Sequence, residues 1–427
     1  MKKTSFNLNW QFKRVDSDEA PQSINLPHDA MLYEKRDRNT PTAGACGYFP
    51  GGAYEYSKTF YMPENEHENV HILEFEAVYK NASVYINGVL AAQRPYGYTN
   101  FYVSMDEHLH FGGENQIKVI ADNSAVPNSR WYSGSGIYRN VNLYTGNAFH
   151  FLPDGLLIST ADNESVAVKA AVSGGDQVKV VVTDHDEVVA KAIENVVNQQ
   201  ATIHLCVPQP RLWDAEHPEL YRCTAYLLKD GKEVDQAEDL FGFRTLKWNV
   251  KGFYVNGKET LLRGACIHHD NGILGACSFE DAEERRVRLL KEAGFNFSYD
   301  SNGKEISRTS MTTAGKETRL QIIPEKLSLR PNSQDLCYVN IDLVGTDGVT
   351  KSTEDVPITV TVSGAGSLLA LGSAKPNMGE CFFADTHTTY YGKALAVIRT
   401  GNECGKIHIK ASAPNLEDQF IELEVRE

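Results

Sequence analysis

The sequence predicts a mainly β protein in which several β-sandwiches accompany one short α/β insert. Short segments of alternating apolar and polar residues recur over most of the 427 residues, separated by turn pairs such as Asn87-Gly88 and Asp230-Gly231. This pattern is typical of antiparallel sandwiches. Only residues 251–302 have the order strand, loop, helix, strand. The hydrophobic fraction of 41% and the charged fraction of 23% are those of globular protein, and a chain of this length forms about two to four domains.

Residues 1–147 are expected to form a jelly-roll domain. Tyr54, Tyr56 and Lys58 begin an alternating segment, and Asn87-Gly88 lies between two apolar runs. Because both residues of such a pair adopt positive φ readily, the pair suits a type I′ turn between antiparallel strands. Repeated short strands of this kind indicate a sandwich or jelly roll. His28-Asp29 lies in a loop, where it is expected to make local hydrogen bonds.

Two further segments are expected to form immunoglobulin-like sandwiches. In residues 148–247 the runs VAVKAAV, QVKVVVTD and ATIHLCV are alternating or continuous apolar strands, and Asp230-Gly231 closes a hairpin. In residues 298–427 the runs LCYVNIDLVG and VPITVTVSG alternate, after a leftover hairpin over residues 298–314. Three residues of this last domain are expected to be surface or packing residues, namely His387, Tyr390 and Tyr391.

The insert at residues 248–297 begins with a hairpin. Asn256-Gly257 separates two short strands at residues 253–255 and 260–262. Residues 261–267 then predict the first strand of a parallel unit.

A helix is expected after this strand and its loop. Ser278 with Asp281 resembles a capping box, so the helix should begin near Phe279. Gly294 is suited to end it, since glycine adopts the left-handed conformation that follows many helices. A second strand at residues 295–297 would complete a βαβ unit. The residues at helical spacing that predict the buried face are Val287, Leu290 and Ala293, with Leu289 beside them.

Several motifs resemble one enzyme family. VNGKETLLRGACIHHDNGILGA, followed by EERRVRLLKEAGFN, resembles the opening of the catalytic (β/α)8 barrel of glycoside hydrolase family 2, the family of β-galactosidases, β-glucuronidases and β-mannosidases. LPHDAM, GYFPGGAYEYSKTFYMP and SRWYSGSGIYRNVNLYTG resemble the galactose-binding-like domain at the N-terminus of that family. RLWDAEHPELYRCTAYL resembles the end of its immunoglobulin-like domain, and residues 300–427 resemble the sandwich that follows the barrel in longer members.

The resemblance to the barrel stops early. After residue 297 the chain passes into SYDSNGKEISR, which resembles the domain after the barrel. A retaining glycosidase needs two carboxylates roughly 5 Å apart, and the resemblance implies glutamates after the fourth and seventh barrel strands. About 55 residues separate Leu246 from Ser301, whereas a complete barrel requires roughly 250. We therefore expect a β-galactosidase-type family member by descent that lacks hydrolase activity, because both catalytic glutamates are missing.

No catalytic residue is expected, but the resemblance implies four substrate-binding candidates, which are Arg130, Trp131, His268 and Asp270. Trp131 could instead pack in a core or between domains, since an aromatic ring buries a large area wherever it lies. Arg130 could brace a domain interface by pairing with a carboxylate. Zinc binding by His268, His269 and Asp270 has poor geometry, because neighbouring side chains of an extended segment point to opposite faces. We expect neither a metal nor a cofactor.

The net charge limits the partners. At −14 it disfavours nucleic acid and anionic membranes, which require a basic face. β-linked glycans are the expected ligands. The βαβ unit would expose apolar surface and open strand edges unless the hairpin, the neighbouring sandwiches or a second copy of the chain covered it, so a homodimer is one expectation.

The cysteines and the first residues bear on localisation. The eight cysteines include no Cys-x-x-Cys pair, which indicates mostly buried free thiols in a reducing compartment. The N-terminal residues lack the apolar stretch of a signal peptide, so a cytoplasmic protein is expected, or one from which such a peptide was trimmed.

Two other functions stay open. The chain could be a non-catalytic carbohydrate-binding or assembly protein, which an open aromatic platform of Trp131, Tyr96 and Tyr98 would favour. It could also be an active glycosidase whose missing barrel is supplied by a separate chain. The residues that would choose between galactose and glucuronic acid belong mostly to the missing barrel segment.

Overall fold

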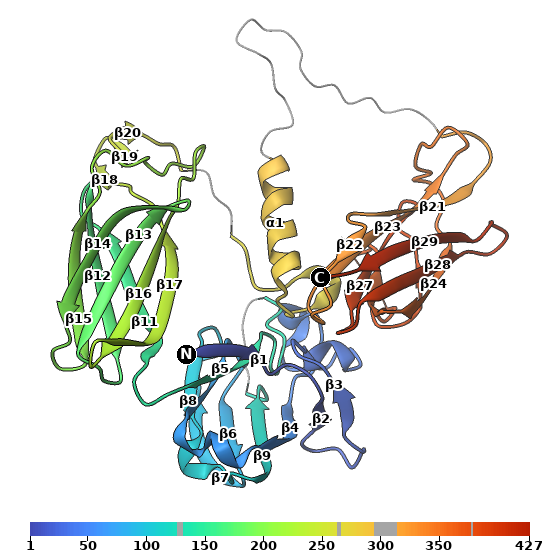
Figure 1. Cartoon of the computed structure of the whole chain (residues 1–427). Helices are drawn as coiled ribbons and strands as arrows, with labels where there is room; N and C mark the ends of the chain where they lie inside the picture. Colours follow the sequence, from blue (N-terminus) through green and yellow to red (C-terminus); the bar gives the residue numbers. More distant parts are fainter. Residues whose placement is uncertain (126–130, 263–265, 294–313, 377–378) are drawn as a thin grey trace, which may run out of the picture. The chain divides into compact units, whose positions relative to one another are not determined.

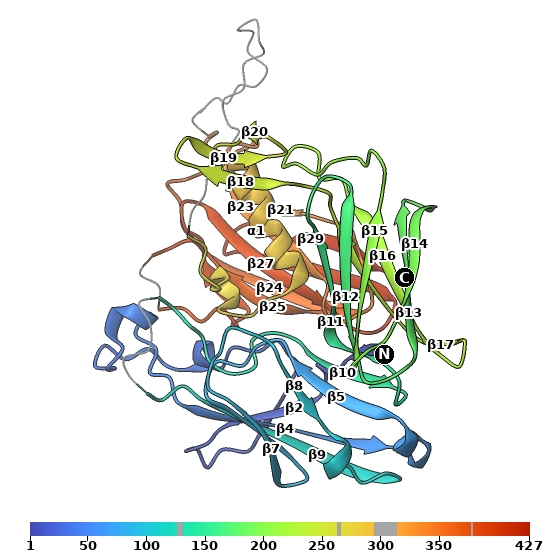
Figure 2. The same cartoon turned by 90° about the vertical axis from the view of Figure 1, so that its left-hand side faces the viewer.

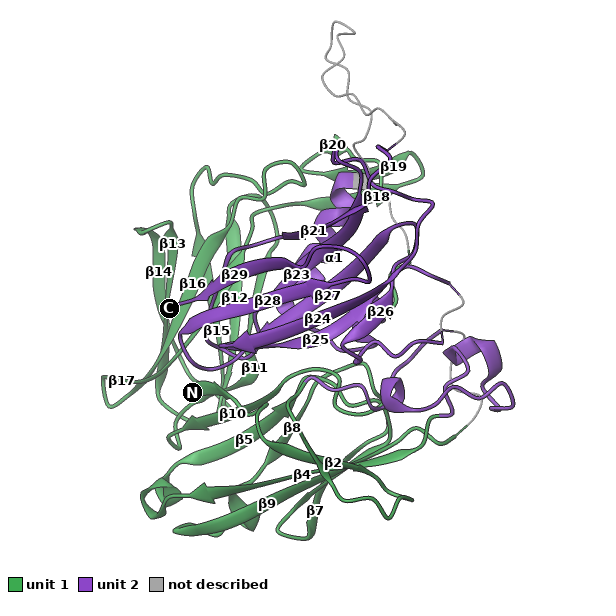
Figure 3. Ribbon diagram, turned by 90° about the vertical axis from the view of Figure 1, so that its right-hand side faces the viewer, with its two compact units in different colours: residues 1–26, 51–125, 135–268 green, residues 27–50, 126–134, 269–427 purple. Residues whose placement is uncertain are grey.

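The computed structural model describes residues 1–125, 131–262, 266–293, 314–376 and 379–427, and they form the mainly β protein that the sequence predicts (Figure 1). Contacts divide the chain into two units that are not contiguous in sequence (Figure 3). Unit 1 contains residues 1–26, 51–125 and 135–268, and unit 2 contains residues 27–50, 126–134 and 269–427. Two loops from the N-terminal third therefore belong to the same unit as the C-terminal sandwich.

The N-terminal part of unit 1 is a sandwich of two sheets, with strand orders β1-β10-β5-β8 and β3-β2-β4-β9-β6-β7. Trp10, Tyr54 and Tyr56 are fully buried, which explains the alternation along the predicted strand. Asn87-Gly88 joins β6 to β7 with φ values of 49° and 83°, as the sequence predicts. The elements are β1 (Lys2–Ser5), β2 (Trp10–Arg14), β3 (Gln22–Ile24), β4 (Ala53–Met62), η3 (Glu64–Glu68), β5 (Val70–Phe75), β6 (Ala82–Ile86), β7 (Val89–Arg94), β8 (Phe101–Ser104), η4 (Asp106–His108), β9 (Gly113–Asp122) and β10 (Val141–Gly146).

The rest of unit 1 is a second sandwich and a small three-stranded sheet. Sheets β11-β12-β15 and β14-β13-β16-β17 bury a valine-rich core that includes Val168, Val178 and Val180 (Figure 2). Asp230-Gly231 joins β16 to β17, so this predicted hairpin is confirmed. Asn256-Gly257 joins β19 to β20 as predicted, but the second strand is at residues 258–259 and not at 260–262. The strands are β11 (Phe151–Thr160), β12 (Ser165–Val172), β13 (Gln177–Asp184), β14 (Glu187–Asn195), β15 (Gln200–Cys206), β16 (Tyr221–Lys229), β17 (Lys232–Phe241), β18 (Leu246–Asn249), β19 (Gly252–Val255) and β20 (Lys258–Glu259).

Unit 2 is built on a third sandwich, with strand orders β21-β23-β27-β25 and β22-β29-β28-β24-β26. Cys337, Val339 and Ile341 of β23 point into its core. Because side chains alternate along a strand, Asn340 and Asp342 lie on the outer face of the same sheet. The strands are β21 (Arg319–Pro324), β22 (Ser328–Leu329), β23 (Leu336–Val344), β24 (Pro357–Gly364), β25 (Gly366–Gly372), β26 (Thr386–Thr388), β27 (Lys393–Thr400), β28 (Gly405–Ser412) and β29 (Gln419–Val425).

Helix α1 (Glu280–Ala293) is the one α-helix of the described residues, and it covers part of that outer face (Figure 2). It begins one residue after the expected position, and Gly294, the predicted end of the helix, lies outside the described residues. The predicted buried face is wrong, since Val287 and Leu290 are 62% and 48% exposed. The helix instead turns Ala282 towards the sheet, where it is buried together with Phe279.

The capping box is also wrong. Ser278 Oγ donates a hydrogen bond to the Glu283 carboxylate at 3.1 Å. The Asp281 carboxylate accepts from the backbone N–H of Leu336 at 2.6 Å. The carboxylate of Asp281 therefore binds the neighbouring sheet and not the backbone of Ser278, as a capping box would require.

The strands expected on either side of α1 are not seen. Residues 261–262 and 266–267 are described and are not in a strand, and Leu261 is 77% exposed. A parallel strand needs neighbours for its hydrogen bonds, and the described residues include no further barrel strand. The strand expected at residues 295–297 lies outside the described residues, as does the hairpin at residues 298–314 apart from its last residue.

All eight cysteines are free thiols, but the prediction that most are buried is wrong, since only Cys46, Cys223 and Cys337 are buried. No helix among the described residues is long and apolar enough to cross a membrane.

Candidate functional site

Three segments that the sequence separates lie together in unit 2. The first is the loop at residues 27–50, which contains η1 (Ala30–Tyr33) and η2 (Ala43–Cys46). The second is the short segment 131–134, and the third is the loop 269–279 before α1, with η5 (Gly272–Leu274). They include the WYSG residues 131–134 and the HDNGILGA residues 269–276 of the motifs that predict contact with a sugar.

Asp29 connects the three segments. It is 1% exposed, and its Oδ1 accepts from the backbone N–H of Met31 at 3.1 Å, which caps η1. Its Oδ2 accepts from the Tyr132 hydroxyl at 2.7 Å and from the backbone N–H of Ala276 at 2.8 Å. A buried carboxylate is stable only with partners of this kind. The expected local hydrogen bond of Asp29 is confirmed, and the two long-range bonds were missed because no local pattern relates these positions.

The backbone approaches Asp29 so closely that no ligand fits beside its carboxylate. Gly134 and Gly275 both have positive φ, 64° and 61°. A Cβ at Gly134 would lie 2.8 Å from Asp29 Oδ2, and one at Gly275 would clash with the same oxygen. Asp29 is therefore a structural carboxylate and not a catalytic one.

The neighbouring His28 is 4% exposed. Its ring stacks on Tyr33 with centroids 4.9 Å apart, and Tyr33 stacks in turn on Phe383 at 4.4 Å. Burial lowers the pKa of His28 to about 3, because the interior disfavours its charged form. His28 is therefore neutral at physiological pH.

The segments that contain the predicted site residues do lie together, but the contacts between them are made by adjacent residues. His269 donates from Nε2 to the carbonyl oxygen of Ser133 at 2.6 Å, which joins the histidine loop to the segment that contains Trp131. Trp131 is half-buried, and its carbonyl accepts from Cys46 Sγ at 3.6 Å. His268 and Asp270 are exposed, and Arg130 lies outside the described residues. No group of His, Cys, Asp and Glu suited to a metal ion occurs in the described part of the chain.

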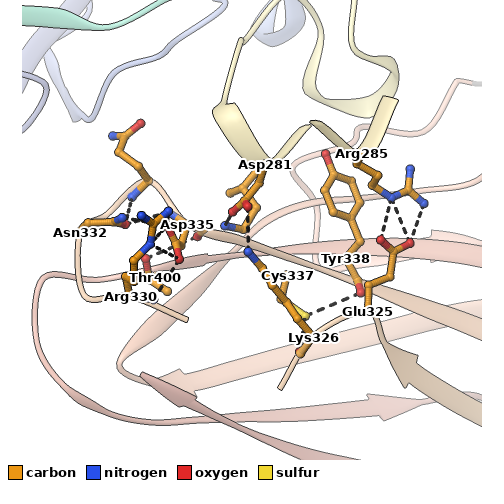
Figure 4. A network of polar contacts seen from close by, with 12 residues as sticks. Asp281, Arg285, Glu325, Lys326, Arg330, Asn332, Asp335, Cys337, Tyr338 and Thr400 are labelled. Atoms are coloured by element: carbon orange, nitrogen blue, oxygen red, sulfur yellow. Dashed lines mark hydrogen bonds and ion pairs between the residues drawn. The ribbon is translucent and has the colours of Figure 1, made fainter. Parts of the chain in front are cut away.

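Polar contacts fix the start of α1 on the sheet (Figure 4). Besides the backbone N–H of Leu336, the Asp281 carboxylate accepts from Lys326 Nζ at 2.8 Å. These two partners come from β23 and from the turn between β21 and β22, so one carboxylate positions the first helical turn.

A second anchor lies one helical turn further along (Figure 4). The Arg285 guanidinium donates to both oxygens of Glu325 at 2.8–3.0 Å and lies 4.3 Å above the ring of Tyr338. Burial alone would raise the pKa of Glu325, but hydrogen bonds from Arg285 and Arg288 lower it. Bidentate pairs of this type also fix orientation.

The buried carboxylates among the described residues of unit 2 all accept hydrogen bonds from the protein itself. Two carboxylates among its described residues are buried, Asp29 and Asp335. Asp335 accepts from the guanidinium of Arg330 at 2.8 Å and from the Asn332 amide at 2.8 Å. Neither matches the catalytic pair of a glycosidase, which leaves one acid protonated and one carboxylate free to attack or to activate water.

Comparison with known proteins identifies the family. Residues 156–244 match "Glycosyl hydrolases family 2", and residues 320–422 match "Glycoside hydrolase family 2 C-terminal domain 5". β-Galactosidase BoGH2A of Bacteroides ovatus is 33% identical over 324 residues, which cover 69% of this chain and 38% of that enzyme. The chain belongs to glycoside hydrolase family 2. A β-glucuronidase of Bacteroides fragilis is 28% identical over 329 residues, which cover 68% of this family 2 chain and 45% of that enzyme.

Solved structures agree with this assignment. A family 2 member from Bacteroides cellulosilyticus has a TM-score of 0.90 at 18% identity, with 100% of both chains covered. At this identity the likeness shows the fold alone. A β-glucuronidase from Bacteroides uniformis has a TM-score of 0.60 at 25% identity, over 69% of this chain and 39% of that one.

The family 2 chain is short between its two matched segments. It spans less than half the length of either curated relative. Between the matches lie residues 245–319, which are 75 residues, and their described part contains β18, β19, β20, η5 and α1. A complete (β/α)8 barrel requires roughly 250 residues, so none fits there.

Proposed function

We propose that this chain is a β-galactosidase- or β-glucuronidase-type member of family 2 that does not hydrolyse glycosides. The observation that carries the proposal is the interval of 75 residues between the two matched segments, which is too short for the barrel that would hold the catalytic pair. The hydrogen bonds that Asp29 accepts from Met31, Tyr132 and Ala276 support it, because they give the buried carboxylate that joins the predicted sugar segments a structural role.

Hydrolysis of nitrophenyl β-galactoside, β-glucuronide and β-mannoside by the purified chain at high enzyme concentration tests the proposal. We expect no release of nitrophenol above buffer. Release that disappears in His268→Ala would contradict it, because the loop would then form part of a working site. Mixing the chain with a separately expressed family 2 barrel tests whether a partner restores turnover, and no gain is expected.

A second candidate function is binding of carbohydrate without catalysis. Exposed aromatic rings favour it: Tyr96 is 54% exposed and meets Tyr98 edge to face, with centroids 5.5 Å apart. Aromatic rings that are apolar in body and polar at the tip are common at contact surfaces.

We also propose that the chain forms a homodimer through α1. Val287, Leu289 and Leu290 are 62%, 42% and 48% exposed on the helix, and clustered apolar side chains of this size mark contact surfaces. Light scattering should show two chains per particle, whereas a monomer would exclude the dimer.

A further inference from the structure

Unit 2 contains a groove of about 630 Å³ between α1 and the part of sheet β21-β23-β27-β25 that α1 leaves uncovered. Asn340 and Asp342 of β23 and Leu395 of β27 contribute to the sheet side of this groove, and Leu289 of α1 forms part of the helix side. Small-molecule sites have volumes of about 300–1,000 Å³ and are mostly apolar, with a few polar groups that orient the ligand. The groove has the size and the composition of such a site.

The charged side chains of the groove already have partners. Lys393 pairs with Asp342 at 2.9 Å across its floor. Arg285 pairs with Glu325 at 2.8 Å, and Arg286 pairs with a carboxylate one turn earlier on α1 at 3.1 Å. Because each of these charges is already balanced by a neighbour, the groove offers no uncompensated charge to an ion and favours an uncharged ligand.

Amide groups supply the unused hydrogen-bonding capacity. Asn271 lines the groove, and its Nδ2 is buried without a hydrogen-bond partner among the described residues. A buried donor of this kind calls for a partner that the chain itself does not supply. Asn340 also lines the groove and is half-buried. A carboxamide both donates and accepts, which matches the dual character of a hydroxyl group.

Tyr391 provides an aromatic surface at a backbone position that does not favour it. The residues 390–393 form a tight turn, with φ of 52° at Tyr391 and 71° at Gly392. Asn, Asp and Gly are the residues that such a turn favours, and a bulky side chain in the left-handed region is an outlier that suggests function. Tyr391 lines the groove, is 59% exposed, and meets Tyr390 with centroids 4.4 Å apart.

We propose that this groove binds an uncharged oligosaccharide, with one sugar ring packed on Tyr391 and hydroxyl groups bonded to Asn340 and Asn271. A sugar offers an apolar C–H face to an aromatic ring and hydroxyl groups to amides, and it is neutral. The inference rests on the carbohydrate-binding candidate proposed above, and it is independent of whether the chain hydrolyses glycosides.

Titration calorimetry with cellotetraose, xylotetraose and β-1,4-galactotetraose tests the inference, with tetragalacturonate as the charged comparison. At least one neutral probe should bind at one site per chain, and tetragalacturonate should not. Tyr391→Asn should weaken that binding at least tenfold. Because the turn favours Asn over Tyr, this variant should keep or raise the Tm, so loss of binding is separated from loss of folding.

Tyr48→Asn is the matched control. Tyr48 also has a left-handed backbone, with φ of 65°, and is 46% exposed, but it does not line the groove. This variant should bind as the unmodified chain does. Asn340→Ala tests the floor of the groove and should also weaken binding at least threefold.

Binding of none of the neutral probes, equal affinity in Tyr391→Asn, or preference for tetragalacturonate would each overturn the inference. So would a dimer that Tyr391→Asn converts to monomer, because a second copy would then occupy the groove. If the chain binds a neutral probe and also hydrolyses nitrophenyl glycosides, the proposed loss of hydrolysis is wrong and the groove proposal stands. If the chain does neither, only the groove proposal is wrong.

Discussion

The Tyr132 hydroxyl donates a hydrogen bond at 2.7 Å to the Asp29 carboxylate, which lies 103 residues earlier in the chain. The same oxygen accepts from the backbone of Ala276. Two segments that resemble sugar-binding parts of family 2 are thus held to each other through one buried side chain. In a chain with no room for a complete barrel, this contact holds the loops of unit 2 together.

Asp29→Asn should lower the free energy of unfolding of unit 2 by about 2–3 kcal/mol, since it removes hydrogen bonds to a charged acceptor. Tyr132→Phe removes one of them and should cost about 1 kcal/mol. Because the two side chains share a bond, the double variant should cost less than the sum of the single ones. Urea denaturation measures all three, and strict additivity would show that the pair is not coupled.

Alanine at two glycines of the loop before α1 tests how closely this loop packs on Asp29. Gly272 and Gly275 both have positive φ, 57° and 61°, and with ψ of −130° the backbone of Gly275 lies in a region that glycine alone adopts readily. A Cβ at Gly272 meets nothing within 4 Å, whereas one at Gly275 clashes with Asp29 and Leu32. Gly275→Ala should therefore lower the Tm much more than Gly272→Ala. Equal effects would show that the loop moves to accommodate the added methyl group.

Asp281→Ala tests the anchor of α1. It leaves the N–H of Leu336 and the Lys326 ammonium without their carboxylate, and it should cost about 1–3 kcal/mol. Glu284→Ala is the control, because Glu284 lies one turn away and is exposed; its cost should stay within about 0.5 kcal/mol. Hydrogen exchange should become faster in α1 of the Asp281 variant, and unchanged exchange would mean that the helix is held elsewhere.

Stability should fall in mild acid through His28. Its pKa is lowered from 6.5 to about 3 in the folded chain, so between these values the unfolded chain binds a proton that the folded chain excludes. The free energy of unfolding should therefore decrease as the pH falls below 6.5, by up to about 1.4 kcal/mol per pH unit from this group. His28→Gln should unfold with a shallower pH dependence between pH 6 and pH 4, and an unchanged slope would show that His28 is hydrated.

Local features of the fold were predictable, and contacts between distant segments were not. Asn87-Gly88 and Asp230-Gly231 mark hairpins because their φ values depend on the two residues themselves. The start of α1 was also predictable from the sequence to within one residue. Its buried side was not, because the helix has apolar residues on more than one side and only the sheet beside it decides which side is covered. Val287 is therefore exposed, and Ala282 is buried.

The candidate sites show the same limit. Asp29 has a local role that its position in a loop predicts, but its bonds to Tyr132 and Ala276 depend on tertiary structure. Tyr391 was expected to be a surface or packing residue, and the groove beside it is formed by residues from α1 and from strands far along the chain. The one feature of the sequence that pointed to an unusual role for Tyr391 was its position directly before Gly392 in a turn.

The proposed loss of hydrolysis requires that this family 2 chain has no catalytic nucleophile. Intact-mass spectrometry after incubation with 2-deoxy-2-fluoro-β-glycosyl fluorides of galactose, glucuronic acid and mannose tests it, because such reagents trap the glycosyl-enzyme intermediate of retaining glycosidases. The readout is stoichiometric, so a trace of contaminating enzyme cannot mimic it. We predict an unchanged mass for the whole population, whereas a glycosyl adduct on an aspartate or glutamate of this chain would contradict the account.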